Sequence, residues 1–189
     1  EMVERDWSSD VCSSDLKGTK VFSISGDVES PGVYEMEMGS PLRELVEGLA
    51  SAKDVKMVQV GGAAGRIVSA DEMGMPLSYE TVLGPGAIIV FDKSRDVVDI
   101  MSRTMEFFAE ESCGKCAPCR EGTQAMREML TRISEGKGTR KDLQALDQLS
   151  GAMMLTSSCG LGQAAPIPVL DSLRYFRHEY EAHVHEWIS

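Results

Sequence analysis

The chain has 189 residues, of which 42% are hydrophobic and 26% are charged, so it can bury at least one core and form two small domains. Its 19 basic and 30 acidic residues give a formal net charge of -11, which repels phosphate backbones and argues against a nucleic-acid partner. No apolar run approaches the roughly 20 residues that cross a bilayer, so we expect a cytoplasmic location and no direct membrane insertion.

The first 16 residues stand apart from the rest of the chain. The stretch RDWSSDVCSSDL, residues 5–16, is polar and Ser-rich, and it resembles the translation of sequencing-adapter DNA. We therefore expect residues 1–16 to be a non-native or disordered tail, with Cys12 outside any metal site. An adapter origin would make the protein a fragment whose own sequence starts near Lys17.

Residues 17–93 have the pattern of a small β-grasp domain. A hairpin comes first, and Ser40 with Pro41 then predicts the start of a short amphipathic helix. Two further strands follow this helix. The four expected strands cover residues 21–24, 33–36, 55–60 and 86–92.

The segment GGAAGR, residues 61–66, raises the question of a phosphate-binding loop, because glycines after a strand can expose amide groups to an anion. The sequence RIVSADE that continues from Arg66 predicts extended or irregular chain instead of the required helix, and the Gly-Lys-Ser/Thr ending is missing. The pattern therefore favours a structural loop over a nucleotide site.

Residues 94–189 change to a helical period of about 3.6 residues and predict a four-helix bundle, so the fold class is α+β. Ser94 is the expected cap of the first helix, Thr139 with Asp142 forms a capping box for the third, and Pro168 opens the fourth. The methionines on the apolar faces are core filler and not metal ligands. The expected inward faces are Val97, Ile100, Met101, Met105 and Phe108; Met126, Met129, Leu130 and Ile133; Leu143, Leu146, Leu149 and Met153; and Leu173, Phe176, Tyr180, Val184 and Trp187.

Four cysteines fall in two links of this bundle. Cys113, Cys116 and Cys119 lie between the first two helices, and Cys159 lies between the third and fourth. In a chain without an export signal, such thiols bind metal or do redox chemistry more often than they form disulfides. A Cys-x2-Cys-x2-Cys run with a remote cysteine favours a 4Fe-4S cluster, whereas zinc sites usually use two separated Cys-x2-Cys knuckles.

Residues beside these cysteines suit a cluster. Gly114, Gly160 and Gly162 would allow close backbone approach and offer amide donors to the sulfurs. Lys115 and Arg120 would offset the negative charge of four thiolates, although a solvated surface role explains them equally well.

The histidines and a possible cysteine nucleophile give weaker evidence for a functional site. His178, His183 and His185 fit surface positions better than a metal site, because His183 and His185 point in different directions on a helix. Cys119 has no local histidine to act as the base of a nucleophilic pair. We therefore expect no catalytic residue in this chain.

The motifs ESCGKCAPCREGT and SSCGLGQAAPIPVLDSLRYFRHEYEAH resemble the C-terminal part of the flavin- and NADH-binding subunit of respiratory complex I and of related NAD(P)-linked hydrogenases and formate dehydrogenases. VGGAAGRIVSADE and LGPGAIIVFD resemble the β-grasp segment of that family, of the soluble-ligand-binding type. The resemblance implies that the four cysteines ligate a 4Fe-4S cluster, which takes electrons from NADH-reduced FMN and passes them to an iron-sulfur partner subunit. It also implies peripheral attachment to the inner membrane through partner subunits.

The chain departs from that family in three places. The glycine-rich flavin and nucleotide domain is absent, so we expect neither FMN nor NADH to bind this chain alone. Ala117 stands where relatives often carry threonine, and the chain ends without the ferredoxin-like extension of some hydrogenase relatives. Two hypotheses stay open: an electron-transfer module of an NADH-oxidising enzyme that is not catalytic alone, or a non-catalytic scaffold with a structural zinc or iron-sulfur site.

Overall fold

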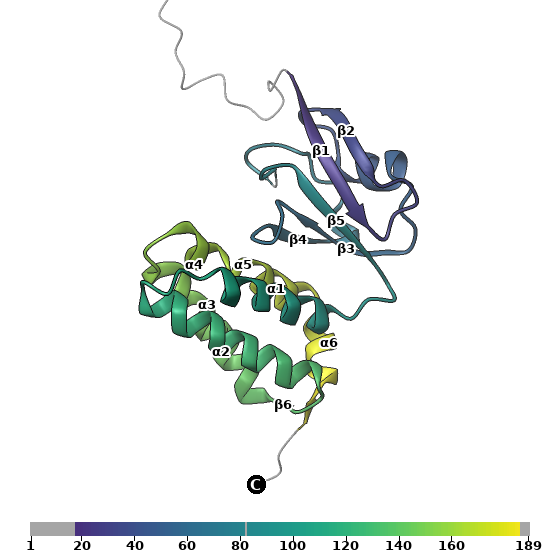
Figure 1. Ribbon diagram of the computed structural model, residues 1–189. Helices are drawn as coiled ribbons and strands as arrows, with labels where there is room; N and C mark the ends of the chain where they lie inside the picture. Colours follow the sequence, from purple (N-terminus) through teal and green to yellow (C-terminus); the bar gives the residue numbers. More distant parts are fainter. Residues whose placement is uncertain (1–17, 82, 186–189) are drawn as a thin grey trace, which may run out of the picture. The chain divides into compact units, whose positions relative to one another are not determined.

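The computed structural model describes residues 18–81 and 83–185 (Figure 1). The chain divides into two compact units. One comprises the described residues up to Gly62 together with Val68–Asp92, and the other comprises Ala63–Ile67 and the described residues from Lys93 onward. Cys12, within the expected tail, lies outside the described residues.

The first unit is built on a five-stranded mixed sheet with the order β2-β1-β5-β3-β4. Strand β1 pairs antiparallel with β2 and parallel with β5, and β5 pairs antiparallel with β3. The sheet confirms the predicted α+β class and fits the β-grasp arrangement. The strands are β1 (Thr19–Gly26), β2 (Gly32–Glu37), β3 (Val55–Val60), β4 (Arg66–Ser69) and β5 (Ala87–Asp92).

A short helical segment packs into the core of this unit. It has π-helical hydrogen bonding over Glu44–Leu49 (η2), and its buried Leu45 joins the same apolar cluster as Phe22 of β1. The predicted Ser40 cap is wrong, because Arg43 is the N-cap of η2 and makes no side-chain capping hydrogen bond. The Ser40 carbonyl instead accepts a hydrogen bond from the Leu77 amide at 2.8 Å. A single 3-10 turn, η3 (Ala70–Glu72), follows β4.

The glycine loop before β4 turns the chain directly into a strand. Gly61 and Gly62 have φ values of +105° and +76°, which favour glycine, and the chain then enters β4 and not a helix. The Arg66 guanidinium forms two hydrogen bonds with the buried Asp171 carboxylate, at 2.6 and 2.9 Å. That guanidinium is therefore engaged by an internal carboxylate.

The second unit is mainly helical, and its three long helices lie in the segments where they were predicted. The expected capping box is present at the start of α3: the Thr139 hydroxyl accepts from the Asp142 amide, and the Asp142 carboxylate accepts from the Thr139 amide. The helices are α1 (Val97–Glu111), α2 (Ala117–Ser134), α3 (Arg140–Thr156), α4 (Gly160–Ala164), α5 (Ile167–Tyr175) and α6 (Arg177–Ala182). Two short strands, β6 (Gly138–Thr139) and β7 (Val184–His185), pair in parallel.

The predicted continuous fourth helix is wrong. The backbone leaves helical geometry at Phe176, with φ -124° and ψ 30°, and α6 begins directly afterwards. This break lets the Tyr180 hydroxyl reach the Ser172 hydroxyl at 2.6 Å inside the core. A continuous helix would separate these two residues by about 12 Å along its axis. Val184 belongs to β7 and not to this helix, and Trp187 lies outside the described residues.

The start of α1 also differs from the prediction. Asp96, not Ser94, is the N-cap, and its side chain accepts a hydrogen bond from the Asp99 amide at 2.9 Å. Burial alone would raise the pKa of Asp96, but hydrogen bonds from the Asp99 amide and from His183 outweigh it and lower this pKa. His183 was predicted at the surface; it is half-buried and contacts Asp96 at 2.9 Å, whereas His178 is exposed.

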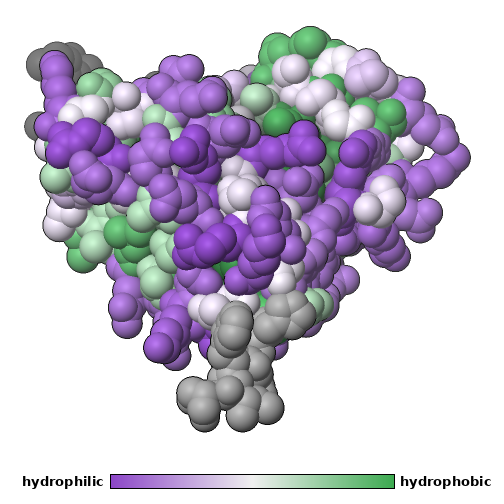
Figure 2. Space-filling model, turned by 60° about the horizontal axis from the view of Figure 1, so that its bottom comes forward, coloured by the Kyte–Doolittle hydropathy of each residue, from purple (hydrophilic) through white to green (hydrophobic). Residues whose placement is uncertain are grey.

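Methionines fill much of the helical core, as predicted. The side chains of Met101, Met105, Met126 and Met153 have no exposed surface. Ile100 and Leu149, predicted to face inward, are only half-buried. Hydrophilic residues dominate the face shown in Figure 2, where hydrophobic residues form separate patches. Within residues 18–81 and 83–185, none of the helices has the length and apolar character needed to span a membrane.

Candidate metal centre

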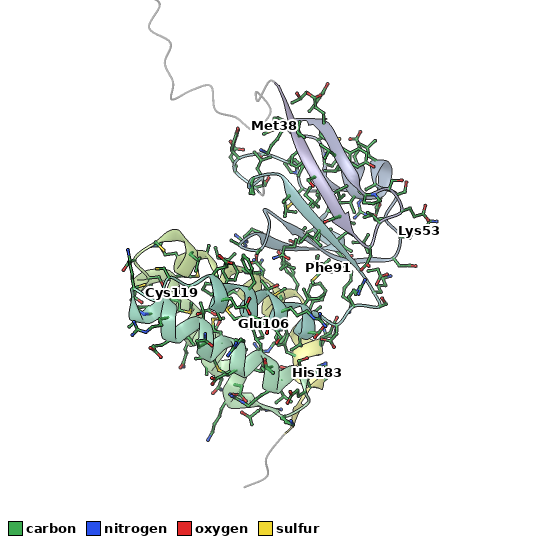
Figure 3. The ribbon with its side chains drawn as sticks, viewed as in Figure 1. Met38, Lys53, Phe91, Glu106, Cys119 and His183 are labelled. Carbon is green, nitrogen blue, oxygen red and sulfur yellow. The ribbon has the colours of Figure 1, made fainter. Side chains whose placement is uncertain are left out.

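The four predicted ligands lie where helices begin or end. Cys113 follows α1, Cys116 is the N-cap of α2, Cys119 lies in the first turn of α2, and Cys159 is the N-cap of α4. In Figure 1, α1 and α3 end and α2 and α4 begin at the same end of the helical unit. Figure 3 labels Cys119 at this end and His183 toward the other.

Local chemistry shapes the link that carries the first three cysteines. Gly114 has φ +73°, a conformation that L side chains rarely adopt, and it turns the chain between Cys113 and Cys116. The Arg120 guanidinium donates to the Gly114 carbonyl at 2.8 Å and ties this turn to α2. Pro118 in the first turn of α2 suits a helix start, because no backbone partner for its nitrogen is needed there.

The two cysteine-bearing links meet through Cys116. The backbone amide of Ser158, the residue before Cys159, donates to the Cys116 sulfur and is the main cause of the lowered pKa of this thiol. The Cys119 amide adds a second hydrogen bond in the same direction. Because the thiolate is the form that ligates metal, these amides prepare Cys116 for coordination.

The two links also pack directly on each other at Gly162. A Cβ built on Gly162 would lie 2.6 Å from the Ser157 hydroxyl oxygen, 2.7 Å from the Ser157 Cβ and 2.8 Å from the Cys119 Cβ. Since real Cβ atoms essentially never make such short contacts, only glycine lets α4 approach Cys119 this closely. Close backbone approach was predicted for Gly162, and the approach is to Cys119 and Ser157. No atom lies within 4 Å of a Cβ built on Gly160.

Side-chain hydroxyls surround the buried Cys119, which is 4% exposed. The Ser112 hydroxyl oxygen lies 3.3 Å from the Cys119 sulfur. The Ser157 hydroxyl is also buried and has no hydrogen-bond partner in the described protein. The Thr123 hydroxyl donates to the Cys119 carbonyl at 2.8 Å, which fixes the backbone beneath the thiol.

The outer cysteines are open to solvent. Cys113 and Cys159 are exposed, Cys116 is half-buried, and none of these four thiols forms a disulfide. Among the described residues, no group of three His, Cys, Asp or Glu side chains is arranged to hold one metal ion. A 4Fe-4S cluster does not need such a group, because each of its cysteines binds a different iron.

The two basic residues near the thiols are exposed, as expected for solvated surface residues. Lys115 and Arg120 are both exposed, and Arg120 also pairs with Glu121 at 2.8 Å. Their effect on the charge of the thiolates stays a prediction.

Sequence reasoning missed Ser157, Ser158 and Gln163. Gln163 donates from its side chain to the Ser157 carbonyl at 2.9 Å, and the Ser157 amide donates to the Met153 carbonyl at 3.0 Å, so both backbone groups of Ser157 are held. The only sequence feature that pointed to these residues was the pair of serines directly before Cys159. It does not tell which of the two serines is buried.

Comparisons with known proteins find similar sequences and structures. Residues 99–183 match the NADH-ubiquinone oxidoreductase-F iron-sulfur binding region. The NADP-reducing hydrogenase subunit HndC of Solidesulfovibrio fructosivorans is 38% identical, covering 95% of this chain and 39% of that protein. An NADH-quinone oxidoreductase subunit of Streptomyces coelicolor is also 38% identical, covering 95% of this chain and 42% of that protein. The chain thus spans about two fifths of the length of these relatives.

Solved structures of NAD+-reducing [NiFe]-hydrogenase share the fold. The air-oxidized form has a TM-score of 0.86 and 39% sequence identity, covering 93% of this chain and 32% of the matched chain. The H2-reduced form has a TM-score of 0.85 and 38% identity, covering 92% and 31%. Residues 99–183 are therefore similar to the NADH-ubiquinone oxidoreductase-F iron-sulfur binding region, and the chain is similar to part of subunits of NADH-quinone oxidoreductases and NAD(P)-reducing hydrogenases.

Proposed function

We propose that this chain is an electron-transfer module whose 4Fe-4S cluster is held by Cys113, Cys116, Cys119 and Cys159. The observation that carries the proposal is the meeting of the two cysteine-bearing links, through the Ser158 amide on Cys116 and the packing of Gly162 on Cys119. The cluster domain would cover residues 94–189, beside a β-grasp domain over residues 17–93.

The residues present fit such a cluster. The buried Ser157 hydroxyl without a protein partner and the Ser112 hydroxyl near Cys119 offer donors to sulfur. Amide donors lower the pKa of Cys116 and favour its thiolate. When bound, a 4Fe-4S cluster takes up and releases one electron at a time.

The electron source in the whole protein follows from the chemistry of NADH. NADH delivers a hydride, which carries two electrons, so a flavin has to stand between it and a one-electron centre. We infer that FMN and NADH are bound by a different part of the whole protein. In the described residues, the glycine-rich turn leads into strand β4 and lacks the helix of a dinucleotide-binding turn.

A partner subunit is the proposed electron acceptor. Cys113 and Cys159 are exposed, so a redox partner could approach this end of the helical unit closely. Leu155, which is 87% exposed, and Met154, which is 39% exposed, stand shortly before Cys159 in the chain. Exposed apolar side chains favour a protein surface as the partner. We propose an iron-sulfur subunit in this role, and peripheral attachment to the inner membrane through such partners.

The test is anaerobic electron delivery to the reconstituted 189-residue chain. We expect dithionite to reduce the cluster and NADH to leave it oxidised, whether or not free FMN is added, with electron paramagnetic resonance as the readout. Rapid reduction by NADH alone would reveal a nucleotide site within this chain and contradict the inference that FMN and NADH bind elsewhere in the whole protein. Failure of dithionite would favour the scaffold hypothesis, with zinc or a purely structural cluster.

A further inference from the structure

The side chain of Ser157 is the one buried polar group in the described residues whose oxygen has no hydrogen-bond partner. The residue is only 4% exposed, and Gln163 and Met153 hold its backbone on both sides. A buried hydroxyl without a partner is destabilising, because it has lost its hydrogen bonds to water without gaining any in the protein. Such a group calls for an acceptor that the protein chain itself does not supply.

The Ser157 hydroxyl lies close to one of the proposed cluster ligands. The Ser157 oxygen and the Cys119 Cβ both lie within 3 Å of the same point, the position of a Cβ built on Gly162. The hydroxyl is therefore a near neighbour of the buried proposed ligand Cys119. The other hydroxyl near Cys119, that of Ser112, already contacts its sulfur at 3.3 Å.

We propose that the Ser157 hydroxyl donates a hydrogen bond to a sulfur of the 4Fe-4S cluster at its Cys119 corner, and thereby raises the reduction potential of the cluster. This inference rests on the proposed function. A donor to sulfur stabilises the reduced form more than the oxidised form, because reduction adds negative charge to the cluster. Ser157 is thus a positioning and tuning residue, not a ligand.

A purely structural role makes a different prediction for Ser157→Ala. If the hydroxyl only fills space, its removal deletes an unsatisfied buried group and leaves the potential unchanged. If it binds the cluster, the same substitution leaves the protein without cluster equally or more stable but makes reduction of the loaded protein less favourable. The stability of the protein without cluster and the reduction potential of the loaded protein are measured separately, and a change in the potential distinguishes the two explanations.

The experiment compares wild type, Ser157→Ala and Thr156→Val after anaerobic reconstitution. Thr156 is the matched control, because its exposed hydroxyl donates to the Ala152 carbonyl in its own helix. We expect equal iron content in all three. We expect the equilibrium constant for one-electron reduction to fall on the order of tenfold in Ser157→Ala alone, a shift of about 59 mV to lower potential. Potentiometric titration followed by electron paramagnetic resonance measures it.

A second readout reports the hydrogen bond itself. In deuterium oxide, pulsed electron paramagnetic resonance of the reduced wild-type cluster should show an exchangeable deuteron that Ser157→Ala lacks and Thr156→Val retains. Equal potentials and equal deuteron signals in wild type and Ser157→Ala, with full clusters in both, would overturn this inference alone. A wild-type chain that binds no iron would overturn the proposed function and the inference with it.

Discussion

Alanine at Cys119 or Cys159 is expected to abolish cluster retention, with iron falling to a small fraction of the wild-type content. Cys119 is buried at the start of α2, and Cys159 begins α4 on the neighbouring link, so each loss removes the ligand from one corner. The same result is expected for Cys113 and Cys116, since a 4Fe-4S cluster needs four protein ligands. Iron and acid-labile sulfide are measured after anaerobic reconstitution and gel filtration.

Cys12 provides the matched control for this series. We expect Cys12→Ala to keep the full iron content, because the sequence places this cysteine outside the cluster motif. Full iron retention in Cys159→Ala would eliminate the remote ligand and leave the centre to be completed by some other group.

Gly162→Ala is expected to displace α4 and to lower cluster content without removing any ligand. Its new Cβ would meet Ser157 and Cys119 at 2.6–2.8 Å, and both neighbours are buried. Overpacking of this kind costs about 1–3 kcal/mol. Because Cys159 lies three residues before Gly162, the strain acts directly on the position of the remote ligand. Iron content and the thermal unfolding midpoint measure the two effects.

Gly151→Ala tests whether this effect is local. Gly151 lies inside α3, and a Cβ built on it would have no atom within 4 Å. Alanine there should stabilise the helix by roughly 0.5–1 kcal/mol and leave iron content unchanged. The two glycine substitutions are therefore expected to shift the unfolding midpoint in opposite directions, and a loss of iron in both would refute the packing argument.

Local patterns predicted much of the fold. The apolar-rich segment VKMVQV predicted β3 over Val55–Val60, and the Thr139 capping box predicted the start of α3. Features such as the start of α1 depend on long-range contacts. Both Ser94 and Asp96 are good N-cap residues, and the Asp96 that the structure uses also contacts His183, which lies 87 positions later. No local pattern contains that pairing.

The candidate site shows the same division between local and long-range information. The spacing of the cysteines and the helical periods around them predicted that Cys159 would lie at the same end of the bundle as the other three. The break at Phe176 could not be predicted, because it serves a hydroxyl contact between Ser172 and Tyr180 in the folded core. The buried state of Ser157 likewise depends on Gly162, which only the packing of α4 brings next to it.

The metal and sulfide content of the reconstituted wild-type chain tests the central claim most directly. A chain that holds one 4Fe-4S cluster is expected to contain about four iron and four acid-labile sulfide per molecule, with visible absorption that dithionite bleaches. Zinc at about one per chain, with no sulfide and no colour, would contradict the electron-transfer module and support the scaffold.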